Sequence, residues 1–159
     1  MKDLFAIILK DTYSLSQLKH RLTILKAYLL KTFFGSSQQT PPLSKNDLNW
    51  LNSLPESFYQ QFNKDNVYKT FADLENTGLK SAFLTMYLTF EPDDETLEQI
   101  GNRARKLFGP DLILDVKFDP TLIAGCSLVW NGIQKDYSLR AKIEEKKPAI
   151  IDGFKRFIR

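Results

Sequence analysis

The chain has 159 residues, of which 43% are hydrophobic and 26% charged, and its formal net charge is +3. This composition is typical of one globular domain or two small ones, and so balanced a charge disfavours a dedicated nucleic-acid-binding protein. The single cysteine and histidine, Cys126 and His20, exclude internal disulfides and zinc sites built from several of either residue. Because no phosphate-binding glycine loop or nucleophile elbow is present, we expect no catalytic residue, no metal and no cofactor.

The apolar runs are too short for a membrane span. The longest, from Leu4 to Leu9, falls far below the ~20 residues that a membrane-crossing helix needs. The acidic Asp3 beside it, and the lack of a small-residue cleavage site after it, argue against a signal peptide. With one cysteine in the chain, we expect a cytoplasmic protein.

The first half of the chain predicts several short helices. Residues 3–10 form a short helix or a lead-in, and the capping box of Ser14 and Gln17 starts a longer helix that Gly35 ends near Phe34. One apolar stripe follows that helix: Leu15, Leu18, Leu22, Leu25 and Leu29. We interpret the stripe as the core of a small bundle. The alternatives are that part of it serves a partner helix, or that it forms a coiled coil, for which two heptads are short.

A polar linker with two prolines occupies residues 35–42, and no element is expected to cross it. Three further helices are predicted after it. They are a helix capped by Ser44 and Asp47 and ended by Pro55, a short one around Phe58, Tyr59 and Phe62, and one from Asn66 to Gly78 that buries Val67, Phe71 and Leu74.

The periodicity changes near residue 84. Met86, Leu88 and Phe90 alternate with polar residues, which predicts a strand. A helix follows, opened by the residues Pro92 to Glu95 and closed by Gly109 and Pro110. Its expected inward positions are Leu97, Ile100, Ala104 and Leu107.

Three more strands are predicted before a last helix. They cover residues 112–118, 122–130 and 133–137, and the last two are joined by Asn131-Gly132, a strong hairpin signal. Ser138 caps the last helix, whose expected inward positions are Ile143, Ile150, Phe154 and Phe157. The predicted fold class is therefore α+β, with a bundle of short helices over residues 1–80 and a small β-α-β-β-α domain over residues 81–159.

The segment from Asp119 to Arg140 carries a family pattern. It combines Asp-Pro-Thr-Leu-Ile-Ala-Gly, an apolar strand, a glycine hairpin and Asp-Tyr-Ser-Leu-Arg. It resembles the C-terminal signature of the delta subunit of F-type ATP synthases, the oligomycin-sensitivity-conferring protein of mitochondria, and the resemblance is strongest over residues 85–158. The matching residues are Asp119, Pro120, Leu122, Ile123, Gly125, Asp136, Ser138, Leu139 and Arg140.

The matched residues suit structural roles. Pro120 fixes a turn, Leu122 and Ile123 are expected on opposite faces of a strand, and Gly125 permits a bulge or a close backbone approach. Asp136 and Ser138 suit capping of the last helix. Ala124 departs from the Gly-Gly pair of the family pattern but keeps a small side chain.

The resemblance implies a non-catalytic stator subunit of a proton-translocating ATP synthase, acting in ATP synthesis and hydrogen ion transport. It implies a place in the peripheral stalk at the cytoplasmic face of the bacterial cell membrane, which the subunit meets only through the complex. The implied partners are the N-terminal helices of the alpha subunits and the C-terminal region of the b subunits, with no nucleic acid. The family has a six-helix N-terminal bundle, and we expect fewer helices here.

Some apolar residues exceed what one narrow buried face requires, and they are the candidates for partner contacts. In the helical half these are Leu4, Phe5, Ile8, Ile24, Tyr28 and Phe33. In the last helix they are Ile150, Phe154 and Phe157. The first group would line a groove for a helix of an alpha subunit, and the second would pack against a helix of a b subunit.

Two other functions remain open. A small α+β nucleic-acid-binding module would stack bases on Tyr87, Trp130 and Tyr137. An enzyme with paired carboxylates would use Asp115 with Asp136, although no cofactor signature accompanies them.

Overall fold

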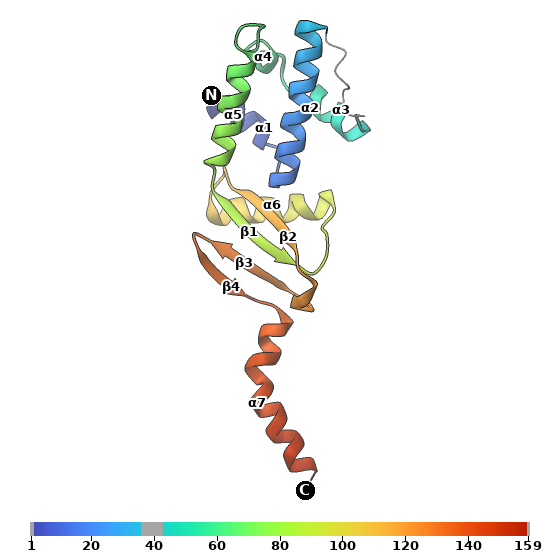
Figure 1. Ribbon diagram of the computed structural model, residues 1–159, viewed down its shortest axis with the longest axis vertical. Coiled ribbons are helices and arrows are strands. Elements are labelled where there is room, and N and C mark those ends of the chain that lie inside the picture. Colours follow the sequence, from blue (N-terminus) through green and yellow to red (C-terminus); the bar gives the residue numbers. More distant parts are fainter. Residues whose placement is uncertain (1, 36–42, 159) are drawn as a thin grey trace.

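The computed structural model describes residues 2–35 and 43–158, so the predicted linker lies, beyond Gly35, outside the described residues. Helices at one end are followed by a four-stranded sheet with one covering helix, and a last helix leads away at the other end (Figure 1). This order confirms the predicted α+β class. The elements are α1 (Lys2–Leu9), α2 (Leu15–Phe34), α3 (Lys45–Ser53), α4 (Glu56–Tyr59), α5 (Val67–Leu79), β1 (Phe83–Leu88), α6 (Asp94–Phe108), β2 (Ile113–Phe118), a 3₁₀ turn η1 (Pro120–Leu122), β3 (Cys126–Trp130), β4 (Ile133–Asp136) and α7 (Leu139–Phe157).

Local signals set the ends of α2 as predicted. The Ser14 hydroxyl accepts from the Gln17 amide nitrogen at 3.2 Å, and the Gln17 side chain accepts from the Ser14 nitrogen at 3.3 Å. Gly35 ends the helix in the left-handed conformation at φ 61°, where a side chain is unfavourable. At each end of α2, one backbone group that would otherwise lack a partner is therefore hydrogen-bonded.

The core of the helical half is wider than the leucine stripe, and this corrects one expectation. The sequence pattern places Leu4, Phe5, Ile8 and Ile24 outside the core, yet none of them is more than 5% exposed. The reason is that α1 packs against α5, while α2 contacts both α3 and α5 and so buries more than one narrow face. These four side chains contribute to the core and do not line an open groove.

The sheet has the strand order β2-β1-β3-β4, with β1 and β2 parallel and the other pairs antiparallel. Helix α6 connects the parallel pair and covers one face, where Ile100 and Ala104 pack against apolar residues of the strands. The hairpin at Asn131-Gly132 is confirmed, since both residues have positive φ, 49° and 78°, as a tight two-residue turn requires.

The third strand is shorter than predicted. Residues 122–125 lie outside it, because Pro120 starts a 3₁₀ turn that ends at Leu122. Leu122 is buried, and Ile123 has φ 69° and is 60% exposed. The expectation that these two residues lie on opposite faces of a strand is therefore wrong.

Helix α6 also differs from its predicted inward face. Leu107 is 73% exposed, whereas Leu97, Gly101 and Ala104 are buried. A Cβ atom at Gly101 would overlap the ring of Tyr13, so the missing side chain admits this tyrosine. The buried face is consequently turned toward Gly101, and Leu107 lies at its margin.

Arg105 joins the helical half to the sheet. Its guanidinium donates to the carbonyl oxygens of Leu9, Thr12 and Leu112 at 2.9, 2.6 and 3.1 Å, and it lies 4.9 Å from the centre of the Tyr13 ring. Burial lowers the pKa of Arg105 from its usual value, and arginine stays charged at neutral pH. One cation thus holds the end of α1 and the start of β2 together.

Backbone pairing strengthens the same junction. The Leu114 nitrogen donates to the Tyr13 carbonyl at 2.8 Å, and a parallel bridge joins Ser14 to Leu114. Ile113, from the sheet, is fully buried in the core of the helical half. The change from helices to strands falls between α5 and β1, and the parts on either side share core and hydrogen bonds across it.

Replacing the junction cation tests its role. Arg105→Ala removes three hydrogen bonds to carbonyl oxygens, of which the Leu9 oxygen keeps the Thr12 nitrogen as a second donor. We expect the free energy of unfolding to fall by about 2–3 kcal/mol. Urea unfolding followed by Trp50 and Trp130 fluorescence measures the loss. Arg103→Ala, at an exposed position of the same helix, is the control and should change stability by less than about 0.5 kcal/mol. Equal effects of the two substitutions would contradict the assignment.

Candidate docking surfaces

Helix α7 leaves the sheet and extends away from the rest of the molecule (Figure 1). None of its side chains is buried, so the predicted inward positions Ile143, Ile150, Phe154 and Phe157 are wrong. The reason is geometric, because α7 contacts the remainder of the chain chiefly at its base, next to η1. Its apolar residues therefore face outward.

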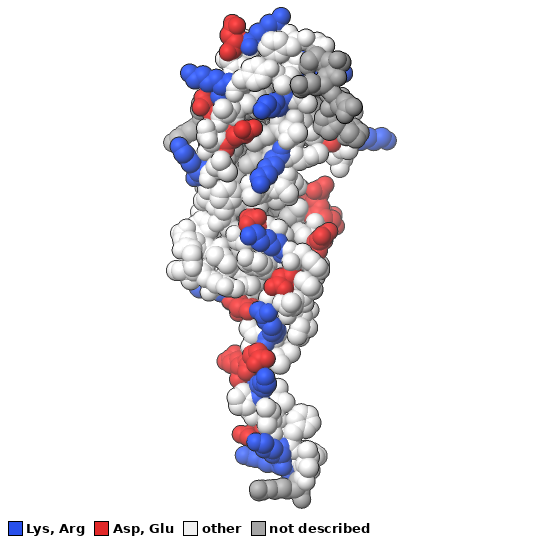
Figure 2. Space-filling view, in the orientation of Figure 1, with Lys and Arg blue, Asp and Glu red and all other residues white. Residues whose placement is uncertain are grey.

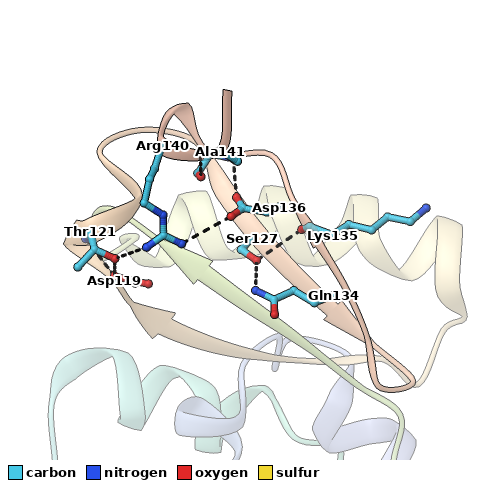
Figure 3. A network of polar contacts seen from close by, with 9 residues as sticks. Asp119, Thr121, Ser127, Gln134, Lys135, Asp136, Arg140 and Ala141 are labelled. Carbon is cyan, nitrogen blue, oxygen red and sulfur yellow. Dashed lines mark hydrogen bonds and ion pairs between the residues drawn. The ribbon is translucent and has the colours of Figure 1, made fainter. Parts of the chain in front are cut away.

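A polar network fixes the base of α7 (Figure 3). The Arg140 guanidinium donates to the Thr121 hydroxyl at 3.0 Å and lies 3.6 Å from the Asp136 carboxylate. Thr121 in turn donates to Asp119 through its hydroxyl at 2.6 Å and its backbone nitrogen at 3.0 Å. The 3₁₀ turn, β4 and α7 are thereby tied together.

Capping completes this attachment. The Ser138 hydroxyl accepts from the Ala141 nitrogen at 3.2 Å, and the Asp136 carboxylate accepts from the Ser138 nitrogen at 2.9 Å. Hydrogen bonds from Thr121 hold the pKa of Asp119 below its usual value, and those from Ser138 do the same for Asp136. Arg140 lowers the pKa of both carboxyl groups further.

Gly125 allows two backbone segments to meet at this base. Its φ is 85°, and a Cβ atom there would lie 2.6 Å from the Tyr137 carbonyl oxygen. Beside it, the Leu139 nitrogen donates to the Ala124 carbonyl at 2.8 Å. The close approach that the sequence suggests for Gly125 is thus present, and most of the family-pattern residues gather where α7 begins.

The rest of α7 is an exposed apolar surface. The candidate partner residues Ile150, Phe154 and Phe157 are 46%, 65% and 95% exposed. Figure 2 shows uncharged surface between the basic and acidic side chains of this helix. Further exposed apolar residues on and next to it are Leu139, Ile143, Ile151 and Ile158.

A second apolar surface lies between α2 and α5. This groove, of about 370 Å³, is lined by Leu15, Leu18, Leu22, Thr23, Gly78 and Leu79, with Lys19 and Glu75 beside them. Leu79 is 70% exposed at its rim. Sequence reasoning missed the groove because Gly78 is typical of a helix stop, although α5 continues to Leu79.

The remaining candidates of the helical half lie elsewhere on α2. Tyr28 is 42% exposed and its ring lies 5.8 Å from that of Tyr59, while Phe33 is half-buried at the edge of the core. Neither lines the groove between α2 and α5.

A polar cleft of about 600 Å³ separates α3 from the N-terminal end of α6. In it Arg21 lies 5.0 Å from the Trp50 ring and donates to Thr12, and His20 contacts Asp47 at 3.0 Å. Across residues 2–35 and 43–158, no three His, Cys, Asp or Glu residues gather as metal ligands would.

The structure separates two of the three aromatic residues, and both carboxylates, that the two alternative functions would combine. Tyr87 and Trp130 lie on opposite faces of the sheet, since Trp130 packs against Phe108 on the face that α6 covers, so they form no common stacking surface. Asp115 and Asp136 lie on the two opposite edge strands, and each has its own basic neighbour, Lys117 and Arg140.

Comparison with known proteins gives one consistent family. Residues 26–150 match the family described as ATP synthase delta (OSCP) subunit. The chain is similar to the ATP synthase subunit delta of Polaromonas naphthalenivorans, with 29% identity over 64% of this chain and 51% of the relative. It is also similar to those of Verminephrobacter eiseniae, with 35% identity over 41% of this chain and 36% of the relative, and of an Acidovorax species, with 32% identity over 50% and 44%.

The matched segment thus spans about half the length, or less, of the curated relatives. The family match extends well into α2, further toward the N-terminus than the sequence pattern indicates. None of the helices described is both long and apolar enough to cross a membrane.

Two glycines with similar backbones test the attachment of α7. Gly125→Ala combines a positive φ with the overlap on the Tyr137 carbonyl, whereas Gly132→Ala has a positive φ but nothing within 4 Å of the new atom. We expect Gly132→Ala to lower the free energy of unfolding by about 1–2 kcal/mol, from the unfavourable backbone conformation alone. Gly125→Ala should lower it clearly more. Urea unfolding of both variants measures the difference. Losses of the same size would show that the close approach at Gly125 contributes nothing.

Acidification should loosen the base of α7. Because the native pKa values of Asp119 and Asp136 are lowered, their stabilising contribution is complete above the ordinary aspartate pKa of about 3.9 and is lost as the pH falls through the native values. Carboxyl-carbon NMR titration measures both groups. Thr121→Val should raise the pKa of Asp119 toward its ordinary value and change Asp136 much less. An unchanged Asp119 would contradict the assigned cause.

Proposed function

This chain belongs to the ATP synthase delta (OSCP) subunit family, and we propose that it is a non-catalytic peripheral-stalk subunit of a proton-translocating F-type ATP synthase. The observation that carries the proposal is α7, an attached helix whose apolar side chains have no partner within the described chain. A subunit of this kind works by binding two partners at once and performs no chemistry of its own.

The first proposed contact is between α7 and the C-terminal region of the b subunits. Ile150, Phe154 and Phe157 would be covered by an apolar helix, and burying one such side chain stabilises a complex by roughly 1.5–3 kcal/mol. The Arg140 network supports this role because it sets the direction in which α7 leaves the sheet.

The second proposed contact is between the groove of α2 and α5 and an N-terminal helix of an alpha subunit. The groove is apolar along its floor and has one basic and one acidic residue at its side, Lys19 and Glu75. An amphipathic helix laid in such a groove buries its apolar face against Leu18 and Leu22. The sequence pattern favours Leu4, Phe5, Ile8 and Ile24 for the contact with the alpha subunit, but these residues are buried in the core. We therefore assign this contact to the groove between α2 and α5.

Together the two contacts would connect the catalytic head to the membrane sector at the cytoplasmic face of the bacterial membrane. The subunit would resist the torque that the turning rotor exerts on the head. Arg105 supports this mechanical role, because the junction it forms joins the groove-bearing helices to the sheet from which α7 extends.

Paired binding measurements test the proposal. The purified full chain is titrated with a peptide of the N-terminal helix of the alpha protein, and separately with a peptide of the C-terminal region of the b protein, both from the same organism. Leu79→Glu and Phe157→Ser change residues that are 70% and 95% exposed, so both variants should fold. We expect Leu79→Glu to weaken binding of the alpha peptide about tenfold or more, Phe157→Ser to weaken binding of the b peptide to the same extent, and each to spare the other contact.

Each variant is the control for the other contact. Binding of neither peptide at micromolar concentration, by a chain with the expected helix content, would overturn the stalk function. If both peptides bind but Leu79→Glu leaves the affinity for the alpha peptide unchanged, the stalk function stands and the groove is the wrong surface.

A further inference from the structure

The charges of α7 are sorted around its axis. At 3.6 residues per turn, one half of the helix carries the apolar stripe, which consists of Leu139, Ile143, Ile150, Phe154 and Phe157. Four of the six basic residues share that half: Arg140, Lys142, Lys146 and Lys147. All three acidic residues lie on the other half: Glu144, Glu145 and Asp152.

Two of these bases, Lys142 and Lys146, have no ion-pair partner within the described chain. Arg140 is held by Thr121 and Asp136, whereas Lys142, Lys146 and Lys147 are exposed, with Lys147 only 3.5 Å from Glu144 on its own helix. The surface beside the stripe is therefore positive near the base of α7 and purely apolar toward its end.

A notch interrupts the stripe near that end. Gly153 has no side chain and nothing within 4 Å of where its Cβ atom would lie. The surrounding side chains of Ala149, Ile150, Phe154 and Phe157 make an almost wholly apolar hollow. A side chain of a helix packed on this face could occupy the position, as knobs fill holes between packed helices.

Helix α7 also lacks support from within the chain. It contains Pro148 and Gly153, the two residue types least favourable in a helix interior, and no buried side chain stabilises it. Helices in proteins gain most of their stability from tertiary packing. A partner that covers the apolar stripe would therefore stabilise α7.

The charge pattern decides what covers the stripe. Two copies of α7 paired in parallel through this half would bring bases together, which is unfavourable. An antiparallel pair would place the lysines of each copy against the apolar end of the other, where they have no acidic partner. A membrane-surface helix keeps its basic residues on the polar face, whereas Lys146 interrupts the stripe itself, three residues after Ile143 and four before Ile150. An acidic helix meets both features, because its carboxylates would pair with the lysines.

We propose that α7 selects an amphipathic partner helix that has acidic residues beside its apolar stripe and one large apolar side chain that fills the notch at Gly153. This inference rests on the proposed function, since it specifies the chemistry of the stalk partner bound by α7. The acidic part of the partner lies near the base of α7, and the inserted side chain lies near its end.

The notch is tested by filling it. Gly153→Leu should weaken binding of the b peptide, taken from the C-terminal region of that protein, to the full chain by about tenfold or more, since the incoming side chain is excluded. Asp152→Leu adds the same side chain on the opposite half of α7 and should change affinity less than about threefold. Circular dichroism of both variants checks that helix content is kept.

The charge pattern is tested by reversal. Lys142→Glu with Lys146→Glu should weaken binding of the same peptide about tenfold or more, and raising the salt concentration should weaken wild-type binding. Lys155→Glu with Arg156→Glu, on the opposite half, is the matched control and should have a much smaller effect.

The outcomes distinguish a failure of this inference from a failure of the proposed stalk function. If the wild-type chain binds the peptide and neither Gly153→Leu nor the stripe-side reversal weakens it, the inference is overturned and the stalk function stands. If the wild-type chain does not bind the peptide, both this inference and the proposed contact between α7 and the b subunits are overturned. Self-association abolished by Phe157→Ser, or binding to anionic vesicles in place of the peptide, would likewise overturn the acidic-helix assignment.

Discussion

The whole arrangement depends on one cation that satisfies carbonyl oxygens from three places in the chain. Arg105 reaches the end of α1, the turn before α2 and the residue before β2. Carbonyls at the end of a helix have no partner within it, so the guanidinium replaces water where the two halves meet. Tyr13 packs between this group and Gly101, and its carbonyl pairs with Leu114. The direction of the sheet relative to the helices follows from these contacts.

Helix caps and turns could be predicted from the sequence, whereas contacts between distant segments could not. The capping boxes at Ser14 and Ser44 and the hairpin at Asn131 depend on residues within a few positions of one another, and all three are present. The burial of Ile24 depends on a helix from elsewhere in the chain, and the exposure of Phe154 depends on the absence of one among the described residues. Periodicity gives an apolar face but does not say what that face contacts.

The candidate surfaces show the same division. The family pattern around Gly125 is visible in the sequence, along with its turn and capping chemistry, and the structure adds that these residues converge where α7 begins. The excess of apolar residues in α7 is also visible there. The groove of α2 and α5 is not, because its floor consists of the same leucines as the core and its rim is a single residue beyond a glycine.

The junction at Arg105 also imposes an order on synthesis. Its hydrogen bonds to Leu9 and Thr12 connect residues 96 and 93 positions apart. The helical half of the chain therefore leaves the ribosome before Arg105, which joins it to the sheet, has been synthesised. Ile113, which completes the core of that half, follows Arg105 in the chain. Contacts so distant in sequence close slowly. The leucine-rich helices, the last of which ends at Leu79, therefore keep part of their core open until Ile113 has been synthesised.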